Sequence, residues 1–150
     1  MLRITDLQKY SKAYGFNIVA SLAKNEAEKC LKQGASSLKL WQDRGFAGEM
    51  DYMKRDPKIF SSLEKFLPGV KSIICFSFSY FQKDERETPL GHGRIARYAW
   101  GRDYHRQLKK RLENLIQELG LDFKYRIFTD AVPLLERALG AKAYSSFAVS

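Results

Sequence analysis

The spacing of apolar residues predicts a well-defined helix over residues 104–119. Its apolar positions recur at intervals of three and four residues, so they form one stripe: Leu108, Leu112, Leu115, Ile116 and Leu119. Asp103 stands where an N-cap is expected, and Gly120 stands where such a helix ends. This stripe predicts a helix that packs one face against a core.

Seven further elements follow from apolar spacing and from the positions of glycine and proline. In chain order they are a helix at 4–15, a strand at 16–23, a helix at 25–44, a helical turn at 48–55, strands at 70–80 and 122–128, and a helix at 134–143. Asn25 is the expected N-cap of the long helix, and Gly34 with the Ser36–Ser37 pair favours a break in it. Pro133 is expected at the start of the last helix.

The strand at 70–80 is apolar on both faces, because Ile73 and Cys75 alternate with Ile74, Phe76 and Phe78. Such a strand is typical of the middle of a sheet that is covered on both sides. The strand at 122–128 carries Phe123, Tyr125 and Ile127 on one face. The order of helices and strands predicts an α/β or α+β fold with a central sheet flanked by helices.

The chain of 150 residues is long enough for one domain with a substantial core, so residues 1–150 are expected to form a single domain. Hydrophobic residues make up 45% of the chain and charged residues 29%, which is a globular composition. No apolar run reaches the roughly 20 residues of a membrane helix, and Met1–Tyr10 lacks the apolar centre of a signal peptide. These features predict a cytoplasmic protein, a monomer with no membrane partner.

The motifs of several common enzyme and metal sites are absent. The sequence contains no GxGxxG, GxxxxGK[ST], HExxH or GxSxG pattern. Its two histidines and two cysteines lack the spacing of a zinc site. Metal binding by side chains of this chain is therefore not expected.

Residues 93–105, GRIARYAWGRDYH, combine arginines with aromatic residues, in a chain of net charge +9. Arginine forks onto phosphate and stacks on rings, and exposed tyrosine and tryptophan stack on flat ligands. The alternative interpretation is structural: Tyr98 and Trp100 are core aromatics, and the arginines are solvated. The candidate nucleic-acid contacts here and in the following helix are Arg102, His105, Arg106, Lys109 and Lys110.

Asp130 is the candidate catalytic residue, in the segment TDAVPLLER at 129–137. It follows a predicted strand and precedes a predicted helix, where loops commonly present functional groups. Partial burial between Phe128 and Pro133 would raise its pKa and make it a general acid. The alternative is that Asp130 is a helix cap. Glu136 is interpreted as a surface partner, not as a catalyst.

Four segments occur in an order that resembles the N-terminal domain of epoxyqueuosine reductases: GFAGEMDYM, LPGVKSII, GRIARYAWGRDYH and FTDAVPLLERALGAKA. The resemblance implies an oxidoreductase of queuosine biosynthesis that uses cobalamin (vitamin B12) to remove the epoxide oxygen of epoxyqueuosine in tRNA. It also implies a domain similar to cobalamin-processing and nitroreductase-like folds. Its partners would be a tRNA anticodon loop and an iron–sulfur electron-transfer domain or protein.

Carried over by position, the resemblance makes Asp130 the proton donor to the epoxide oxygen. It places Arg137 against the corrin, and it makes Arg97, Tyr98 and Tyr104 part of the cofactor and substrate pocket. In the family a ferredoxin-like domain with two [4Fe–4S] clusters follows, but Cys30 and Cys75 cannot supply four ligands for each cluster.

This departure leads us to expect a chain without the cluster domain, either truncated, frame-shifted or completed by a separate cluster protein. Two alternatives remain at this point: a non-catalytic cobalamin carrier, and a basic RNA-binding module without a corrin site.

Overall fold

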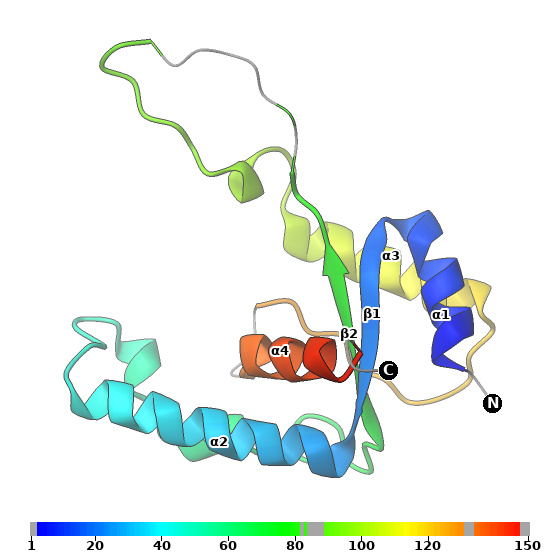
Figure 1. The fold of residues 1–150 in the computed structure, drawn as a ribbon, viewed down its shortest axis with the longest axis horizontal. Coiled ribbons are helices and arrows are strands. Elements are labelled where there is room, and N and C mark those ends of the chain that lie inside the picture. Colours follow the sequence, from blue (N-terminus) through cyan, green and yellow to red (C-terminus); the bar gives the residue numbers. More distant parts are fainter. Residues whose placement is uncertain (1–2, 82, 84–88, 131–133, 148–150) are drawn as a thin grey trace.

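A computed structural model describes residues 3–81, 83, 89–130 and 134–147. The described elements form an α+β fold, in which a sheet of two antiparallel strands lies between helices (Figure 1). The strands are β1 (Phe16–Ala23) and β2 (Ser72–Phe78), and the long helices are α1 (Ile4–Ser11), α2 (Lys24–Asp43), α3 (Tyr104–Glu118) and α4 (Glu136–Phe147). Single-turn 3₁₀ helices are η1 (Lys12–Tyr14), η2 (Asp51–Lys54), η3 (Pro57–Phe60) and η4 (Arg97–Ala99). The predicted sheet flanked by helices is confirmed.

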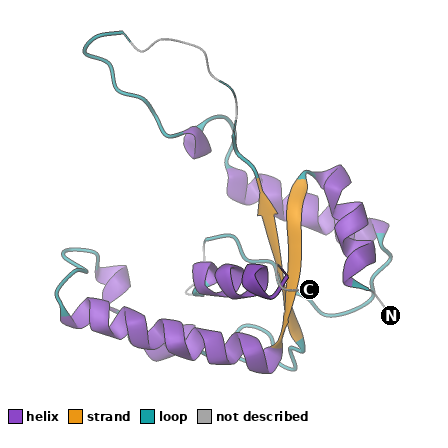
Figure 2. Ribbon diagram, in the orientation of Figure 1, coloured by secondary structure: helices purple, strands orange, loops and turns teal. Residues whose placement is uncertain are grey.

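Alternation along β1 and β2 sends apolar side chains to both faces of the sheet. On one face Ala20 and Leu22 of β1 pack with Leu31 of α2 and Leu139 of α4. On the other face Val19 packs with Leu7 of α1 and Leu115 of α3. Figure 2 shows the two strands side by side, with α2 and α4 to the left of them, α1 to the right and α3 passing behind them. The prediction that both faces are covered is confirmed.

Several predicted boundaries are confirmed. The first strand occupies residues 16–23 as expected, and the preceding helical segment ends at Gly15, whose φ of 80° is left-handed. Asp103 caps α3, because its Oδ1 accepts the backbone N–H of His105 at 3.0 Å. The predicted turn at 48–55 contains η2.

Three predictions about the helices and the sheet are corrected. The long helix begins at Lys24, so Asn25 lies inside its first turn and is not the N-cap; Glu26 reaches back to the N–H of Ala23 at 3.3 Å. The helix also runs through Gly34 without a break. Within the described residues β2 pairs only with β1, so it is not a central strand by its hydrogen bonding.

The third predicted strand, at 122–128, is wrong: these residues carry no strand pairing. Helix α4 begins at Glu136, two residues after the predicted start, and Pro133 lies outside the described residues. No helix in the described part of the chain is long and apolar enough to cross a membrane.

Candidate functional site

The first turn of α3 presents Tyr104 and His105 beside the helix cap. The Asp103 carboxylate accepts the backbone N–H of His105 at 3.0 Å and lies 2.9 Å from its ring Nδ1. These hydrogen bonds with His105 hold the pKa of Asp103 below its usual range. The rings of Tyr104 and His105 stack with their centroids 4.0 Å apart. The capped helix therefore fixes the direction of two polar rings.

Tyr104 reaches Asp130, which lies far away in the sequence. The Tyr104 hydroxyl donates to Asp130 Oδ2 at 2.6 Å. This hydrogen bond is the main reason why the pKa of Tyr104 rises to about 12, and desolvation of the phenol adds to it. The structure thus brings together two of the residues that the sequence predicted, the acid Asp130 and the pocket residue Tyr104.

Asp130 adopts a left-handed backbone conformation, with a φ of 51° that is uncommon for residues other than glycine. Glu136, in the first turn of α4, accepts the backbone N–H of Asp130 with Oε1 at 3.1 Å. Asp130 is not an N-cap, because α4 begins only at Glu136. Its side chain is also exposed, so the partial burial expected from the sequence is wrong.

Glu136 is the half-buried carboxyl group of this cluster. Burial raises its pKa, and the neighbouring charge of Asp130 acts in the same direction. Glu136 is therefore a partner of Asp130, as interpreted from the sequence, but it is half-buried and not a fully exposed surface residue. Its only signal in the sequence is its place shortly after Asp130, and that spacing does not show that its carboxyl group contacts the Asp130 backbone.

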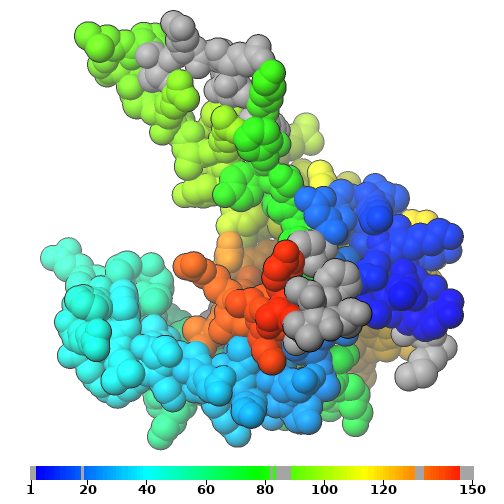
Figure 3. Space-filling model, viewed as in Figure 1, coloured from blue at the N-terminus to red at the C-terminus, as the bar shows by residue number. Residues whose placement is uncertain are grey.

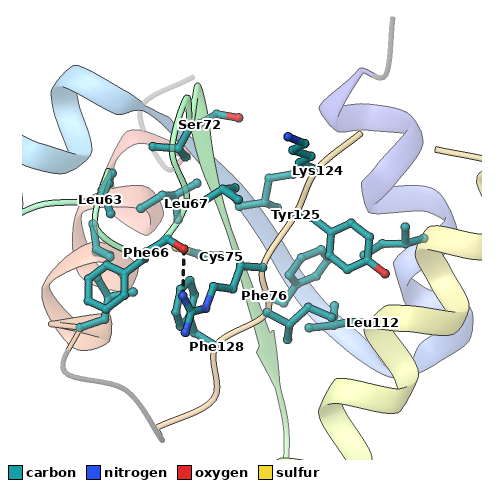
Figure 4. Close-up of a pocket in the computed structure, with 18 of the residues that line it drawn as sticks. Leu63, Phe66, Leu67, Ser72, Cys75, Phe76, Leu112, Lys124, Tyr125 and Phe128 are labelled. Carbon is teal, nitrogen blue, oxygen red and sulfur yellow. Dashed lines mark hydrogen bonds between the residues drawn. The ribbon is translucent and has the colours of Figure 1, made fainter. Parts of the chain in front are cut away.

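An apolar cavity of about 770 Å³ adjoins this cluster. Its walls come from β2, from α3 and from residues 121–129, and Figure 4 shows Cys75, Leu112, Tyr125 and Phe128 around it. Glu136 and Thr129 also line it, so the polar cluster and the cavity share a border. A cavity of this size and character is in the range of small-molecule sites.

Arg126 ties the wall of the cavity to the loop before β2. Its Nη1 donates to the carbonyl oxygen of Phe66 at 2.9 Å, the bond drawn as a dashed line in Figure 4. Its guanidinium also lies 5.4 Å from the ring centroid of Phe128, and the rings of Phe66 and Phe128 meet edge to face. Residues 122–128 are thus held near β2 by side chains although they form no strand with it.

The other predicted cofactor residues lie apart from the cavity. The walls of the cavity include none of the four, which all lie in the described part of the chain: Arg97, Tyr98, Tyr104 and Arg137. Tyr98 is 58% exposed, which does not fit a core aromatic, and it lies near enough to Tyr104 to contribute to the raised pKa of that phenol. The Arg97 guanidinium lies 4.7 Å from the centroid of the Phe81 ring, and Arg137 is exposed beside Glu136.

The predicted nucleic-acid contacts lie on or just before α3. Arg102, Arg106, Lys109 and Lys110 are exposed, and His105 is partly buried. Arg106 and Lys109 face acidic residues of their own segment, Asp103 at 3.7 Å and Glu113 at 3.9 Å. Just before this helix in the chain, the green and lime segment of Figure 3 projects from the body of the molecule. A basic helix thus begins at the foot of a projecting loop.

Comparisons with known proteins find similarity to the same family that the four sequence segments resemble. The sequence model of the family described as "Epoxyqueuosine reductase QueG, DUF1730" matches residues 61–131. The chain is 34% identical to the epoxyqueuosine reductase of Escherichia coli (strain K12), over 75% of this chain and 32% of the relative. It is 31% identical to that of Synechococcus sp. (strain RCC307), over 91% of this chain and 42% of the relative.

A third relative, the epoxyqueuosine reductase of Vibrio cholerae serotype O1, is 37% identical over 75% of this chain and 32% of its own length. No solved structure matches the chain. The chain spans about a third of the length of most of these curated relatives. On these matches, the chain is similar to epoxyqueuosine reductases over about a third of their length.

Proposed function

We propose that this chain contributes the proton-donating part of an epoxyqueuosine reductase, which reduces the epoxide of epoxyqueuosine in tRNA to queuosine. The observation that carries the proposal is the position of Asp130, exposed and hydrogen-bonded to Tyr104 beside an apolar cavity. Opening an epoxide leaves an alkoxide, which needs an acid within hydrogen-bond reach. Tyr104 fixes Oδ2 of Asp130, and Oδ1 is the oxygen that presents the proton.

Cobalamin is the cofactor that we propose for this site. The aliphatic and aromatic walls of the cavity, among them Leu112, Tyr125 and Phe128, suit the apolar face of a large flat ring. Tyr98, Tyr104, Arg97 and Arg137 do not line the cavity, so they would contact only a polar edge of the ring that extends beyond it. When bound, cobalamin supplies a reduced cobalt centre as nucleophile and source of electrons.

The electrons would come from an iron–sulfur domain or partner protein. Each [4Fe–4S] cluster takes four cysteine ligands, and this chain contains two cysteines. Those two, Cys30 and Cys75, are half-buried, on α2 and β2. Cluster ligands from another domain or protein are therefore part of the proposal.

The tRNA would be held by the basic face of α3. Cations there raise the local concentration of RNA, and each contact with a phosphate releases a counterion, so affinity falls as salt rises. Replacing Lys109 and Lys110 with glutamate should weaken tRNA binding in a filter or fluorescence assay and should flatten its salt dependence. Unchanged affinity in this double variant would place the RNA surface elsewhere. Because the proposed reaction acts on tRNA, we also propose a cytoplasmic location.

The test of the proposed function is the Asp130→Asn substitution. The protein is supplied with cobalamin, a chemical reductant or cluster partner, and tRNA that carries epoxyqueuosine. Asparagine keeps the size of the side chain but cannot deliver a proton, so the rate of queuosine formation should fall at least about a hundredfold. Asp122→Asn, at an exposed position of the preceding segment, is the matched control and should be silent.

Two further measurements separate the alternatives. Titration with cob(II)alamin, followed in the visible spectrum, should show binding by wild type and by Asp130→Asn. Binding without any turnover by the supplied wild type would indicate a cobalamin carrier. An unchanged spectrum at high protein concentration, with tRNA affinity intact, would leave a basic RNA-binding module. Full activity in Asp130→Asn would rule out Asp130 as the acid.

A further inference from the structure

Asp130 combines an unusual backbone conformation with a contact from outside its own loop. A left-handed φ of 51° at a residue with a side chain costs free energy, which local hydrogen bonds must offset. The contact that the structure shows at its backbone is the bond from Asp130 N–H to Glu136 Oε1, 3.1 Å long. The second contact, from the Tyr104 hydroxyl at 2.6 Å, acts on the side chain. Backbone and carboxylate are thus held separately.

Glu136 is well placed to fix this turn because α4 anchors it. Its neighbours Leu134 and Leu135 pack against the main core, and Leu139 of the next turn is 1% exposed. The charged or titratable groups that face its carboxyl group are Asp130 in the loop, His105 of α3 and the Cys75 thiol of β2. Glu136 therefore connects the rigid part of the fold to the exposed acid.

We propose that Glu136 is a positioning residue: by accepting the backbone N–H of Asp130, it holds the left-handed turn that brings the Asp130 carboxylate onto the Tyr104 hydroxyl. The geometric part of this inference stands on the contacts alone. Its consequence for catalysis rests on the proposed function, in which Asp130 donates a proton. Glu136 itself acts through Asp130 and does not touch the substrate.

The titration of Tyr104 reports this geometry without cofactor or substrate. Its pKa of about 12, against an ordinary 10.0, depends first on the hydrogen bond to Asp130. Wild type and variants are labelled with ¹³C at the tyrosine ring carbon that bears the hydroxyl, and Tyr104→Phe assigns the signal among eight tyrosines. Asp130→Asn should lower the pKa of Tyr104 toward 10.0. This change gives the size of the pKa shift expected when Tyr104 loses the Asp130 carboxylate.

Three substitutions of Glu136 separate the effect of its side-chain length on the pKa of Tyr104 from the effect of its charge. Glu136→Gln keeps an oxygen acceptor at the same distance and should leave the pKa of Tyr104 near 12. Glu136→Asp keeps the charge but is one methylene shorter, so it should lose the bond and lower the pKa toward 10.0, as Glu136→Ala should. The chemical shift of the same carbon at pH 7 gives the comparison for any variant that unfolds in alkali.

The outcomes are distinct. The proposal would be overturned if the pKa of Tyr104 stays at the wild-type value in both Glu136→Ala and Glu136→Asp. It would also be overturned if Glu136→Gln lowers the pKa of Tyr104 as much as Glu136→Ala does. In the reductase assay, Glu136→Ala should lower kcat by about tenfold to a hundredfold, and Glu136→Gln should stay near wild type. Full activity in Asp130→Asn would remove the proposed function, while the titration would still decide the role of Glu136.

Discussion

The two strands of the sheet are similar in composition and differ in burial. In β1, Phe16, Val19, Ala20 and Leu22 are each less than 5% exposed. In β2, the residues Ile73 to Phe76 are only partly buried, although Leu22 is the direct partner of Ile73 and Ala20 that of Cys75. The two strands share one hydrogen-bonded ladder, so the difference in burial comes from what lies along the edge of each strand that faces away from its partner. The outer side of β2 borders the cavity, because residues 122–128 do not pair with it.

This difference shows where the fold places its chemistry. Around β1 the apolar side chains of α2, α4, α1 and α3 pack against the strand and bury most of its apolar residues. Beside β2 a cavity remains between the strand, α3 and residues 121–129, and it extends to Glu136, next to Asp130 and Tyr104. The well-buried strand β1 thus supports the less buried strand β2, and the candidate site lies beside β2.

The largest expected effect comes from truncating the paired side chains Leu22 and Ile73. Leu22→Ala creates a new cavity in the packed core and should lower the free energy of unfolding by about 2–5 kcal/mol. Ile73→Ala removes a side chain that already borders empty space, so its cost should be nearer 1–2 kcal/mol. Urea denaturation of both variants measures the difference. Equal costs would mean that β2 is packed as tightly as β1.

The second effect is a dependence of the free energy of unfolding on pH, caused by Cys75 of β2. Burial raises the pKa of the Cys75 thiol from an ordinary 9.0 to about 11. The folded protein therefore keeps this proton when the unfolded chain loses it, and stability should fall as the pH rises from about 9 to 11. The loss should be on the order of 1–2 kcal/mol, after allowance for the remaining exposure of the thiol.

Denaturant titrations between pH 8 and 11 test this effect, with Cys75→Ala as the control. Other groups also titrate in this range, so the relevant quantity is the difference between the two proteins. The slope should be shallower in Cys75→Ala. Identical slopes in both proteins would show that the thiol is as solvated in the folded state as in the unfolded chain.

The smallest effect compares two helical glycines, Gly34 in the packed region and Gly140 at the cavity. A Cβ at Gly34 would lie 2.8 Å from Leu135 Cδ1, whereas a Cβ at Gly140 would meet no atom within 4 Å. Gly140→Ala should therefore stabilise the protein by about 0.5–1 kcal/mol through helix propensity. In Gly34→Ala the contact with Leu135 should cancel that gain.

Thermal melts of Gly34→Ala and Gly140→Ala decide the comparison, and the two substitutions make the same chemical change. The Tm of Gly140→Ala should rise and that of Gly34→Ala should stay within error of wild type. A larger gain at Gly34 than at Gly140 would mean that α2 and α4 are not in close contact there.

Local patterns in the sequence were enough to predict β1, α3 and the faces of β2. The period-two and three-to-four spacings record which side of an element is buried, and caps such as Asp103 act within a few residues. The same local reasoning was wrong about a break in α2. The Ser36 and Ser37 hydroxyls bond back to the carbonyls of Lys32 and Gln33, and Gly34 packs against Leu135, the residue just before α4.

The sequence by itself indicated the similarity to epoxyqueuosine reductases, most of the helices and strands, and two candidate site residues that the structure joins by a hydrogen bond, Asp130 and Tyr104. Only the tertiary structure decided that residues 122–128 leave β2 unpaired, because a strand exists by its hydrogen bonds to a partner and not by its alternation. The role of Glu136 was decided in the same way. Its carboxyl group accepts the Asp130 N–H, and the groups that face it include His105 and Cys75, which are distant in sequence. Contacts of this kind depend on how the helices pack around the sheet, which no local spacing of residues records.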